Sequence, residues 1–439
     1  MSAISLRKHP GWLEADGGGV VFLALQYRFC LFRARGPVPG PPAARTVPEE
    51  AMTKLRSRLL STLLAAAALA LPAWAAAAAK VRVGLMLPYT GTYAGLGNNI
   101  TNGFKLFVEE NGGKLGGSEV EYFTVDDESD PAKAPDNASK LIKRDKVDVL
   151  VGTVHSGVAM AMAKVARDNN TLLINPNAGA AELTGPLCSP NLFRTSFTMW
   201  QSSHTMGKVA AAQGKKTAVT FTWAYAAGNE AVEAFKEGFE AAGGKVVKAM
   251  ALPFPQVEFQ SYLTEIAGLK PDMVFSFFSG GGAKKYLADY AAAGLKAKIP
   301  LYGPGFLTEG VLDGSEAAQG VQTTLHYADG LDNAKDKAFR AAYVKAFKAE
   351  PDVFSVQGYD AAQLLAAGLA AVKGDVSKRK EMIAAMEGAR LESPRGKMTL
   401  SKAHNPVNDI YLRKVEGKYN KVVNVAAPAL ADPARGCKM

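Results

Sequence analysis

The chain has 439 residues, of which 48% are hydrophobic and 21% charged, a composition typical of a globular protein with two or more domains. Residues 1–79 hold nine basic and four acidic residues, so the overall net charge of +10 leaves only +5 on the rest of the chain. This mild excess is spread along the chain without a basic block, and we therefore expect no nucleic-acid partner.

Residues 52–79 are typical of a secretory signal peptide. Three basic residues precede the largely apolar run Leu59–Leu71, and Ala-x-Ala cleavage sites lie around Ala73–Ala77. The apolar run is too short to span a membrane comfortably. Because the signal begins at the internal Met52, we interpret residues 1–51 as a misassigned N-terminal extension, with a genuine extension as the alternative. The predicted location of the mature protein is the periplasm.

Two cysteines, Cys188 and Cys437, follow the signal peptide, whereas Cys30 precedes it. Because export places the protein in an oxidising compartment, we predict one disulfide between Cys188 and Cys437. It would tie the C-terminal tail to the loop after the fourth strand, and two free thiols are the alternative. No cysteine stands in a lipobox sequence, so a lipid anchor is not indicated.

From residue 80 onward, strand-like apolar segments alternate with segments of helical periodicity in two series. The first has strands at Val81–Leu87, Val120–Val125, Val147–Val151 and Leu172–Asn175, and helices around 99–111, 132–144 and 157–168. The second has strands at Thr217–Thr222, Val246–Leu252, Met273–Phe278 and Pro300–Tyr302, and helices around 228–242, 259–268 and 282–293. Such alternation predicts an α/β protein whose parallel sheets are covered by helices on both faces.

The segment Leu192–Gly214 interrupts the alternation with a strand-like piece and then a helix, as expected where a chain crosses between lobes. A single barrel of eight strands is the alternative. After Gly320 the pattern changes. It predicts a strand at Val321–His326, helices at Lys335–Phe347, Phe354–Val372 and 377–387, and closing strands at Lys397–Leu400 and Ile410–Val415.

The loop after the first strand, within Val81–Gly97, is rich in Gly, Thr and Tyr and precedes a helix. Ligands of open α/β sheets bind beyond the carboxyl ends of the strands, where this loop lies. Its glycines resemble a phosphate cradle, but no Lys-Ser/Thr pair follows them. We therefore expect a turn that presents backbone N–H groups and the ring of Tyr93, and not a nucleotide site.

Several stretches together resemble the type I periplasmic solute-binding proteins that serve ABC importers of the branched-chain amino acid class. They are VGLMLPYTGTYAGLGNNITNGFKLFVEENGG, DVLVGTVHSGVAMAMAKVA, INPNAGAAELTG, FRTSF, VEAFKEGFEAAGGKVV, PDMVFSFFSGGGAKKYLADYAAAGLK and GYDAAQLLAAGL, and they cover roughly residues 80–415. The resemblance implies two Rossmann-like lobes with parallel sheets, joined by a three-crossing hinge that closes on a ligand. The implied lobe 1 comprises residues 80–195 and 328–395, lobe 2 comprises 196–327 and 396–425, and a tail follows at 426–439.

The resemblance also implies where the carboxylate of a ligand would bind. Its partners come from the loop after the third strand, with His155 and Ser156, and from the loop after the fourth strand, with Asn177, Ala178 and Gly179. Backbone N–H groups at the start of the helix that follows Ser156 would favour an anion. The alternative role of Ser156 is to cap that helix.

Two departures from the family pattern argue against an amino-acid ligand. Amino-acid binders usually carry Ser or Thr where this chain has Gly179. They hold the ammonium with a Tyr and an acid of lobe 2. Tyr225 matches the Tyr, but Gln256 stands where the acid is expected, and Glu258 is two residues further on. An ammonium without a carboxylate partner loses a charge-assisted contact worth on the order of a few kcal/mol.

We therefore expect a small apolar or aromatic carboxylate of the benzoate or cinnamate type, with a branched-chain or other aliphatic amino acid as the alternative. The stretches YGPGFLTEG, LHYADGLDN and SPRGKMTLSKAHNPVNDIYLRKV resemble the aromatic-acid-binding subgroup of the family. The expected ligand-binding residues are Tyr93, Leu96, His155, Ser156, Asn177, Ala178, Gly179, Tyr225, Phe254, Gln256, Phe278 and Tyr359, with Phe277 and Phe306 as further aromatic candidates.

The partners that the resemblance implies are the small-molecule carboxylate and an ABC permease in the inner membrane, with the binding protein itself a monomer. No cofactor or metal is expected, because the histidines show no HExxH or paired-ligand spacing. No enzymatic activity is expected either, since the HSG stretch at 155–157 lacks the preceding glycine of a nucleophile elbow. A ligand-sensing domain of a receptor is the more distant alternative.

Overall fold

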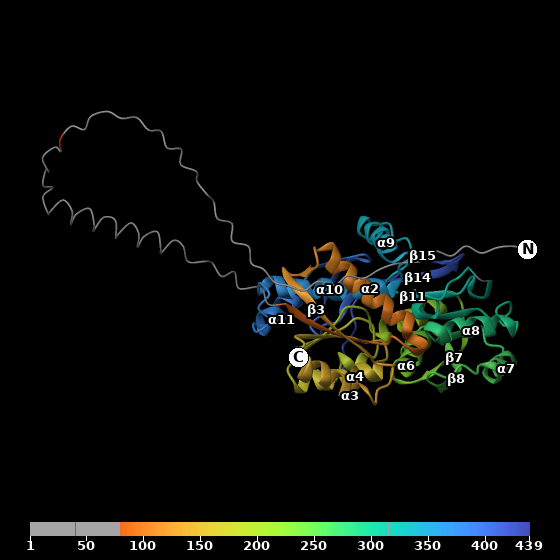
Figure 1. The fold of residues 1–439 in the computed structure, drawn as a ribbon. Coiled ribbons are helices and arrows are strands. Elements are labelled where there is room, and N and C mark those ends of the chain that lie inside the picture. The colour runs from red at the N-terminus through yellow and green to blue at the C-terminus, as the bar shows by residue number, and fades with distance from the viewer. Residues whose placement is uncertain (1–39, 41–79, 315) are drawn as a thin grey trace, which may run out of the picture. The chain divides into compact units, whose positions relative to one another are not determined.

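The computed structural model describes residue 40 and residues 80–314 and 316–439 (Figure 1). The predicted signal peptide at 52–79 lies outside the described residues, and so does the predicted extension at 1–51 except for Gly40. No helix of the described part is both long and apolar enough to cross a membrane.

The first sheet is built from strands of the N-terminal half of the described chain. Its strands are β1 (Val81–Leu87), β2 (Lys114–Leu115), β3 (Ser118–Asp126), β4 (Val149–Val151), β5 (Leu172–Asn175) and β6 (Leu192–Arg194), in the order β2-β3-β1-β4-β5-β6. All neighbours pair in parallel except β2 and β3. The central strand β1 reads VRVGLML and is almost entirely buried, as a parallel strand covered on both faces requires. The accompanying helices are α2 (Ala94–Glu110), α3 (Ala134–Ser139), continued by a π-helical turn at Lys140–Arg144, and α4 (Ser156–Asp168).

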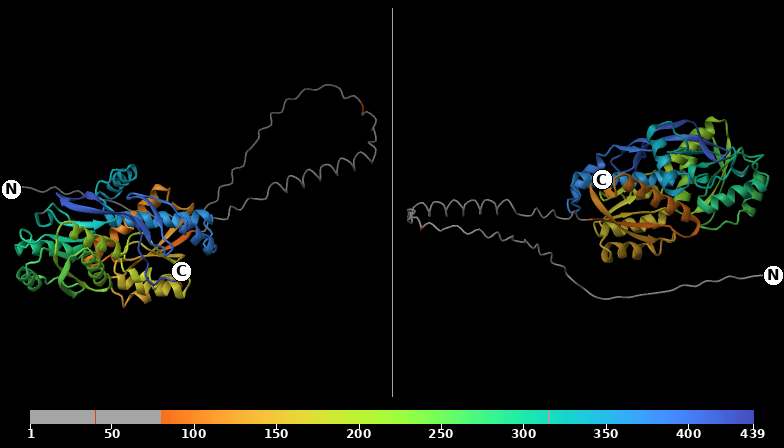
Figure 2. Two further views of the ribbon diagram at one scale, coloured as in Figure 1. Left: turned by 180° about the vertical axis from the view of Figure 1, so that it is seen from behind. Right: turned by 45° about the horizontal axis from the view of Figure 1, so that its top comes forward.

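The second sheet lies beside the first as a separate layer (Figure 2). Its strands are β7 (Thr217–Ala224), β8 (Lys245–Pro253), β9 (Met273–Phe277), β10 (Leu301–Pro304), β11 (Gln322–Leu325), β12 (Leu391–Ser393), β13 (Gly396–Leu400), β14 (Pro406–Glu416) and β15 (Tyr419–Leu430). Their order is β12-β13-β14-β11-β10-β9-β7-β8, and β15 pairs antiparallel with β14. The helices of this lobe are α5 (Met199–Ala212), α6 (Ala226–Ala241), α7 (Gln260–Leu269) and α8 (Gly280–Ala292).

Three helices after β11 return to the first lobe: α9 (Ala334–Phe347), α10 (Val353–Ala371) and α11 (Arg379–Glu387). α10 packs along α2 (Figure 1). Two glycines allow this close approach, since a Cβ on Gly103 of α2 would collide with the carbonyl of Ser355, and one on Gly358 of α10 with the carbonyl of Ile100. The chain thus passes between the lobes after β6, after β11 and before β12.

The predicted fold class is confirmed, because the strands form two α/β lobes with largely parallel sheets and not one barrel. Two details differ from the expectations. Strand β15 was not predicted, and it extends to Leu430, into the segment expected as a tail from residue 426. Strand β12 pairs with β13 in the second sheet, although residues up to 395 were expected in lobe 1.

The C-terminal tail is attached to both lobes. Cys437 forms a disulfide with Cys188 of the loop after β5, with the two Cα atoms 5.5 Å apart. Arg435 forms an ion pair with Glu237 of α6, its Nη2 lying 2.7 Å from Oε1. The tail therefore connects a loop of the first lobe to a helix of the second.

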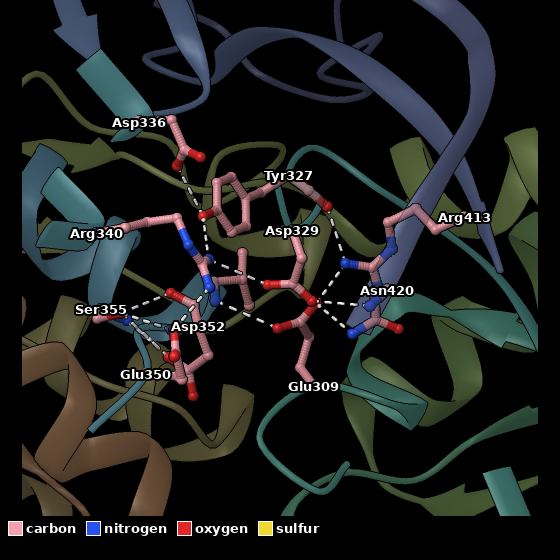
Figure 3. Close-up of polar contacts among 11 residues, drawn as sticks. Glu309, Tyr327, Asp329, Asp336, Arg340, Glu350, Asp352, Ser355, Arg413 and Asn420 are labelled. Atoms are coloured by element: carbon pink, nitrogen blue, oxygen red, sulfur yellow. Dashed lines mark hydrogen bonds and ion pairs between the residues drawn. The ribbon is translucent and has the colours of Figure 1, made fainter. Parts of the chain in front are cut away.

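A buried polar network ties the crossing segments together (Figure 3). Arg413 of β14 pairs with Glu309, which follows β10 and whose Oε2 accepts a hydrogen bond from the backbone N–H of Val353 at 3.3 Å. Asp352 is the N-cap of α10 and accepts from the N–H of Ser355 at 3.0 Å. These contacts hold the second sheet against the N-terminus of a helix of the first lobe.

Candidate ligand-binding site

A small cavity lies between the two lobes, where the carboxyl ends of both sheets face each other. Its lining residues are Tyr93, Leu96, Val154, Asn177, Gly179, Phe197, Met199, Tyr225, Ala227, Phe277, Ser279 and Phe306. Residues from both lobes line it because each follows the end of a strand, or begins the next helix. A ligand held there contacts both lobes at once.

Four helices begin at this cavity. Tyr93, Tyr225 and Ser279, which line it, are the N-cap residues of α2, α6 and α8, and His155 is the N-cap residue of α4. None of these four side chains caps its own helix with a hydrogen bond. Helix N-termini carry a partial positive charge and free backbone N–H groups, so their convergence favours an anion.

One wall of the cavity is aromatic and contains residues of both lobes. The hydroxyl oxygens of Tyr93 and Tyr225 lie 3.3 Å apart across the lobe boundary. The ring of Phe254 packs against both, with centroids 5.2 Å from Tyr93 and 5.5 Å from Tyr225, and the ring of His155 stacks on Tyr225 at 4.9 Å. His155 and Phe254 thus shape the wall from behind Tyr225.

A second aromatic group faces this wall. The ring centroid of Phe197 lies 4.4 Å from that of Phe306, and Phe306 lies 6.3 Å from Phe277. Phe197 was not among the expected site residues, although the strand-end rule that placed the other loops would have included it, because it follows β6. Gly179 makes room for its ring, as a Cβ there would lie 2.5 Å from Cε2 of Phe197.

A buried arginine supports the loop that carries Asn177 and Gly179. The guanidinium of Arg194, at the end of β6, donates to the carbonyl oxygens of Ala178 and Ala180, the latter at 2.8 Å. Ser156 accepts a hydrogen bond from the N–H of Ala180 at 3.2 Å and so holds the same loop from the start of α4. Burial lowers the pKa of Arg194 to about 10, which leaves it charged at neutral pH. Ala178 is therefore buried in the scaffold of the loop.

No charged side chain lines the cavity among the residues that the structure describes. Burial lowers the pKa of His155 to about 4, so its ring is neutral at physiological pH. Burial also raises the pKa of Tyr93 and of Tyr225, which keeps both hydroxyls protonated. The hydroxyl of Ser279 is buried and has no partner among the described residues. The polar side chains of the cavity are thus neutral, and none of the described lining residues offers a carboxylate to an ammonium.

Three expected site residues lie away from the cavity. Phe278 points to the opposite face of the sheet from Phe277, as alternation along a strand requires, and packs 5.1 Å from both Phe221 and Trp223. Tyr359 lies on the face of α10 that packs against Phe107, with the two ring centroids 5.1 Å apart. Its hydroxyl donates a hydrogen bond to the carboxylate of Glu110. Gln256 has an exposed side chain. Its backbone makes the hydrogen bonds, since its carbonyl accepts from the indole N–H of Trp223 at 2.7 Å and its N–H donates to the carbonyl of Pro253 at 2.8 Å.

The other expected residues come together. Tyr93, Leu96, Asn177, Gly179 and Tyr225 line the cavity, and His155, Ser156, Ala178 and Phe254 lie directly behind them. Of the further aromatic candidates, Phe277 and Phe306 also line it. Met199, Ala227 and Ser279 also line it without having been expected, and so does Val154, which lies in the expected loop after the third strand.

Comparisons with known proteins agree with this geometry. The profile of the periplasmic binding protein family matches residues 80–420. A solute-binding protein of an ABC transporter from R. palustris, solved in complex with benzoate, is 54% identical, with a TM-score of 0.81 over 82% of this chain and 100% of its own. A second, from Rhodopseudomonas palustris BisB5 in complex with 3,4-dihydroxy benzoic acid, is 34% identical, with a TM-score of 0.77 over 81% and 99% of the chains.

Among curated proteins, the Leu/Ile/Val-binding protein homolog 6 of Brucella melitensis is 33% identical over 363 residues, which are 80% of this chain and 92% of the relative. The relatives therefore match almost over their whole length. The two lobes and the cavity between them agree with these matches. The chain therefore belongs to the periplasmic binding protein family.

Proposed function

We propose that the protein is the substrate-binding component of an ABC importer and that it captures a small aromatic carboxylate of the benzoate type. The observation that carries the proposal is the convergence of four helix N-termini on a cavity with aromatic walls, which no charged side chain of the described residues lines. A carboxylate would satisfy the N–H groups and neutral donors, while a planar ring would contact the aromatic side chains of the lining, Tyr225 and Phe197 among them. Solute-binding proteins with benzoate and 3,4-dihydroxy benzoic acid bound are among the similar structures.

The alternative ligand is a branched-chain amino acid, because curated relatives are named Leu/Ile/Val-binding proteins. Such a ligand brings an α-ammonium into the cavity. Because no carboxylate of the described part of the chain lines the cavity, the buried ammonium would lack a charged partner, at a cost on the order of a few kcal/mol. This penalty favours the aromatic carboxylate.

The proposed mechanism is capture by closure of the lobes. Several hydrogen bonds cross the lobe boundary in this structure. The hydroxyl oxygens of Tyr93 and Tyr225 lie 3.3 Å apart, the N–H of Gly282 donates to Thr92 Oγ1 at 3.3 Å, and the N–H of Ala181 donates to Glu230 Oε2 at 2.7 Å. A ligand in the cavity adds contacts to both lobes only when they are closed, so it shifts the population toward the closed form. The closed form would then dock on a permease in the inner membrane, from the periplasm.

Calorimetric titration tests the proposal. The purified protein, stripped of ligand by unfolding and refolding, would be titrated with leucine, isoleucine, valine, benzoate, 4-hydroxybenzoate and coumarate. Binding of an aromatic acid without any response to leucine is the expected result. Tight binding of leucine would overturn the proposed ligand class and show that an acid outside the present cavity lining reaches the ammonium.

A further inference from the structure

A chain of three buried polar side chains runs from the cavity to a hinge segment. Asn177 lines the cavity after β5, Gln357 lies on α10, and His326 directly follows β11 where the chain leaves the second lobe. Asn177 Nδ2 lies 2.6 Å from Gln357 Oε1, and Gln357 Nε2 lies 3.3 Å from His326 Nε2. Their residues are only 5%, 0% and 1% exposed, so no bulk water competes for these contacts.

His326 is neutral and carries one ring proton. Its pKa lies well below the ordinary value because of burial and the nearby guanidinium groups of Arg395 and Arg413. Nε2 is in contact with Gln357, whereas Nδ1 is buried without a hydrogen-bond partner among the described residues. The position of the one proton therefore decides which of the two nitrogens is left unsatisfied.

The two hydrogen-bond directions of this chain differ in cost. If Asn177 Nδ2 donates to Gln357 Oε1, then Gln357 Nε2 donates to His326 Nε2, and the ring proton stands on Nδ1 as an orphaned buried donor. Turning both amides by 180° keeps both contacts and moves the proton to Nε2, which then donates to Gln357. A buried N–H without an acceptor is the rarer and costlier defect, so this second direction is favoured.

In the favoured direction Gln357 Nε2 donates to Asn177 Oδ1. The Nδ2 group of Asn177 is then free to donate into the cavity. We propose that Gln357 and His326 are positioning residues that fix Asn177 as a hydrogen-bond donor toward the ligand's carboxylate. This inference rests on the proposed function, because it assumes that the ligand carries a carboxylate. Gln357 and His326 do not line the cavity, and they would favour a carboxylate over neutral polar groups only through Asn177.

The His326 tautomer is a direct test. Long-range proton–nitrogen correlation spectra of the protein labelled with ¹⁵N-histidine distinguish a protonated from an unprotonated ring nitrogen, and the spectrum of His326→Phe assigns the signal. Protonation at Nε2 is the expected result in the ligand-bound protein. Protonation at Nδ1 would overturn the proposed direction of the chain.

The affinities of the protein for benzoate and for benzyl alcohol provide the functional test. Benzyl alcohol has a hydroxyl that both donates and accepts, so it tolerates either orientation of Asn177, whereas benzoate only accepts. Gln357→Met removes the link to His326 and is expected to weaken benzoate binding by about tenfold while changing benzyl alcohol binding much less. The matched control Gln363→Met lies on the same helix with its amide donating to the carbonyl of Glu392, and it should change neither affinity.

The outcomes separate this inference from the proposed function. A wild-type protein that binds no aromatic carboxylate would overturn the proposed function. Wild-type binding of benzoate, with equal losses for benzoate and benzyl alcohol in Gln357→Met, would overturn only the positioning role and assign Gln357 to packing. Thermal unfolding of each variant confirms that the titrated protein is folded.

Discussion

A Cβ atom at position 179 would lie 2.5 Å from Cε2 of Phe197, a separation that real Cβ atoms do not reach. The ring of Phe197 is itself buried and packs 4.4 Å from Phe306 and 5.5 Å from His326, so it has little freedom to move away. The Phe197 ring can therefore keep its position only because residue 179 has no side chain. Both residues serve to line the cavity with an aromatic face.

Gly179→Ser should displace this ring and weaken the binding of benzoate at least tenfold, because the new Cβ and the ring cannot both keep their places. Calorimetric titration measures the affinity. Gly95→Ala is the matched control, since it lies in α2 near the same cavity and its Cβ meets nothing within 4 Å. A Gly179→Ser protein that binds benzoate as tightly as wild type would show that Phe197 does not contact the ligand.

The hydroxyl contact between Tyr93 and Tyr225 crosses the lobe boundary and should contribute to closure. We expect Tyr93→Phe and Tyr225→Phe each to weaken ligand binding, and the double variant to weaken it by less than the sum. The coupling expected from one neutral hydrogen bond is about 0.5 to 1.5 kcal/mol. Titrations of the four proteins complete the double-mutant cycle. Strictly additive losses would mean that the two hydroxyls act independently, each on the ligand.

The disulfide between Cys188 and Cys437 closes a loop with a sequence separation of 249 residues. In the chain-entropy account, removing a cross-link over a long loop lowers the free energy of unfolding by about 2 to 5 kcal/mol. Denaturant titration of the double variant with both cysteines replaced by alanine should show this loss. Reductant should destabilise the wild type by a similar amount and leave the variant unchanged. Equal stabilities of the two oxidised proteins would contradict a stabilising role for the cross-link.

Most of the fold was predictable because its segments carry strong periodicity. The run Val81–Leu87 is buried on both faces and matches β1 at both ends. β15 gave no such signal, since most of its residues are exposed, Pro428 interrupts it, and it pairs only with β14. Its apolar residues are interrupted by Asn424 and Pro428 and do not alternate with polar ones, so the pattern from which a half-buried strand is recognised is missing.

The site was predictable only where strand ends fixed it. Tyr93, Asn177 and Tyr225 follow three different parallel strands, and the rule for open α/β sheets brings such positions together. The same rule does not say which of two consecutive aromatic residues faces the cavity, and Phe278 turned out to face the core behind β9. Tyr359 lies on a helix that is buried nearly all round, so sequence periodicity does not show which neighbour it contacts.

Asp352 should make the folded protein less stable as pH rises through the weakly acidic range. Burial raises the pKa of this N-cap carboxyl from 3.8 to about 6, so between about pH 4 and pH 6 the folded state holds a proton that the unfolded state releases. The resulting loss of stability is complete above pH 6 and absent below pH 4. The nearby carboxylate of Asp329 also raises the pKa of Asp352 (Figure 3).

Asp352→Asn keeps an acceptor for the N–H of Ser355 and removes the titrating group. The difference in unfolding free energy, variant minus wild type, should therefore rise between pH 4 and pH 6 by on the order of 2 kcal/mol. Denaturant titrations at several pH values measure it. Asp375→Asn is the control, because its carboxyl is exposed and a hydrogen bond from Ser377 lowers its pKa, so no such rise is expected there. A pH-independent difference for Asp352→Asn would mean that Asp352 is ionised throughout this range, held so by Asn99 and the start of α10.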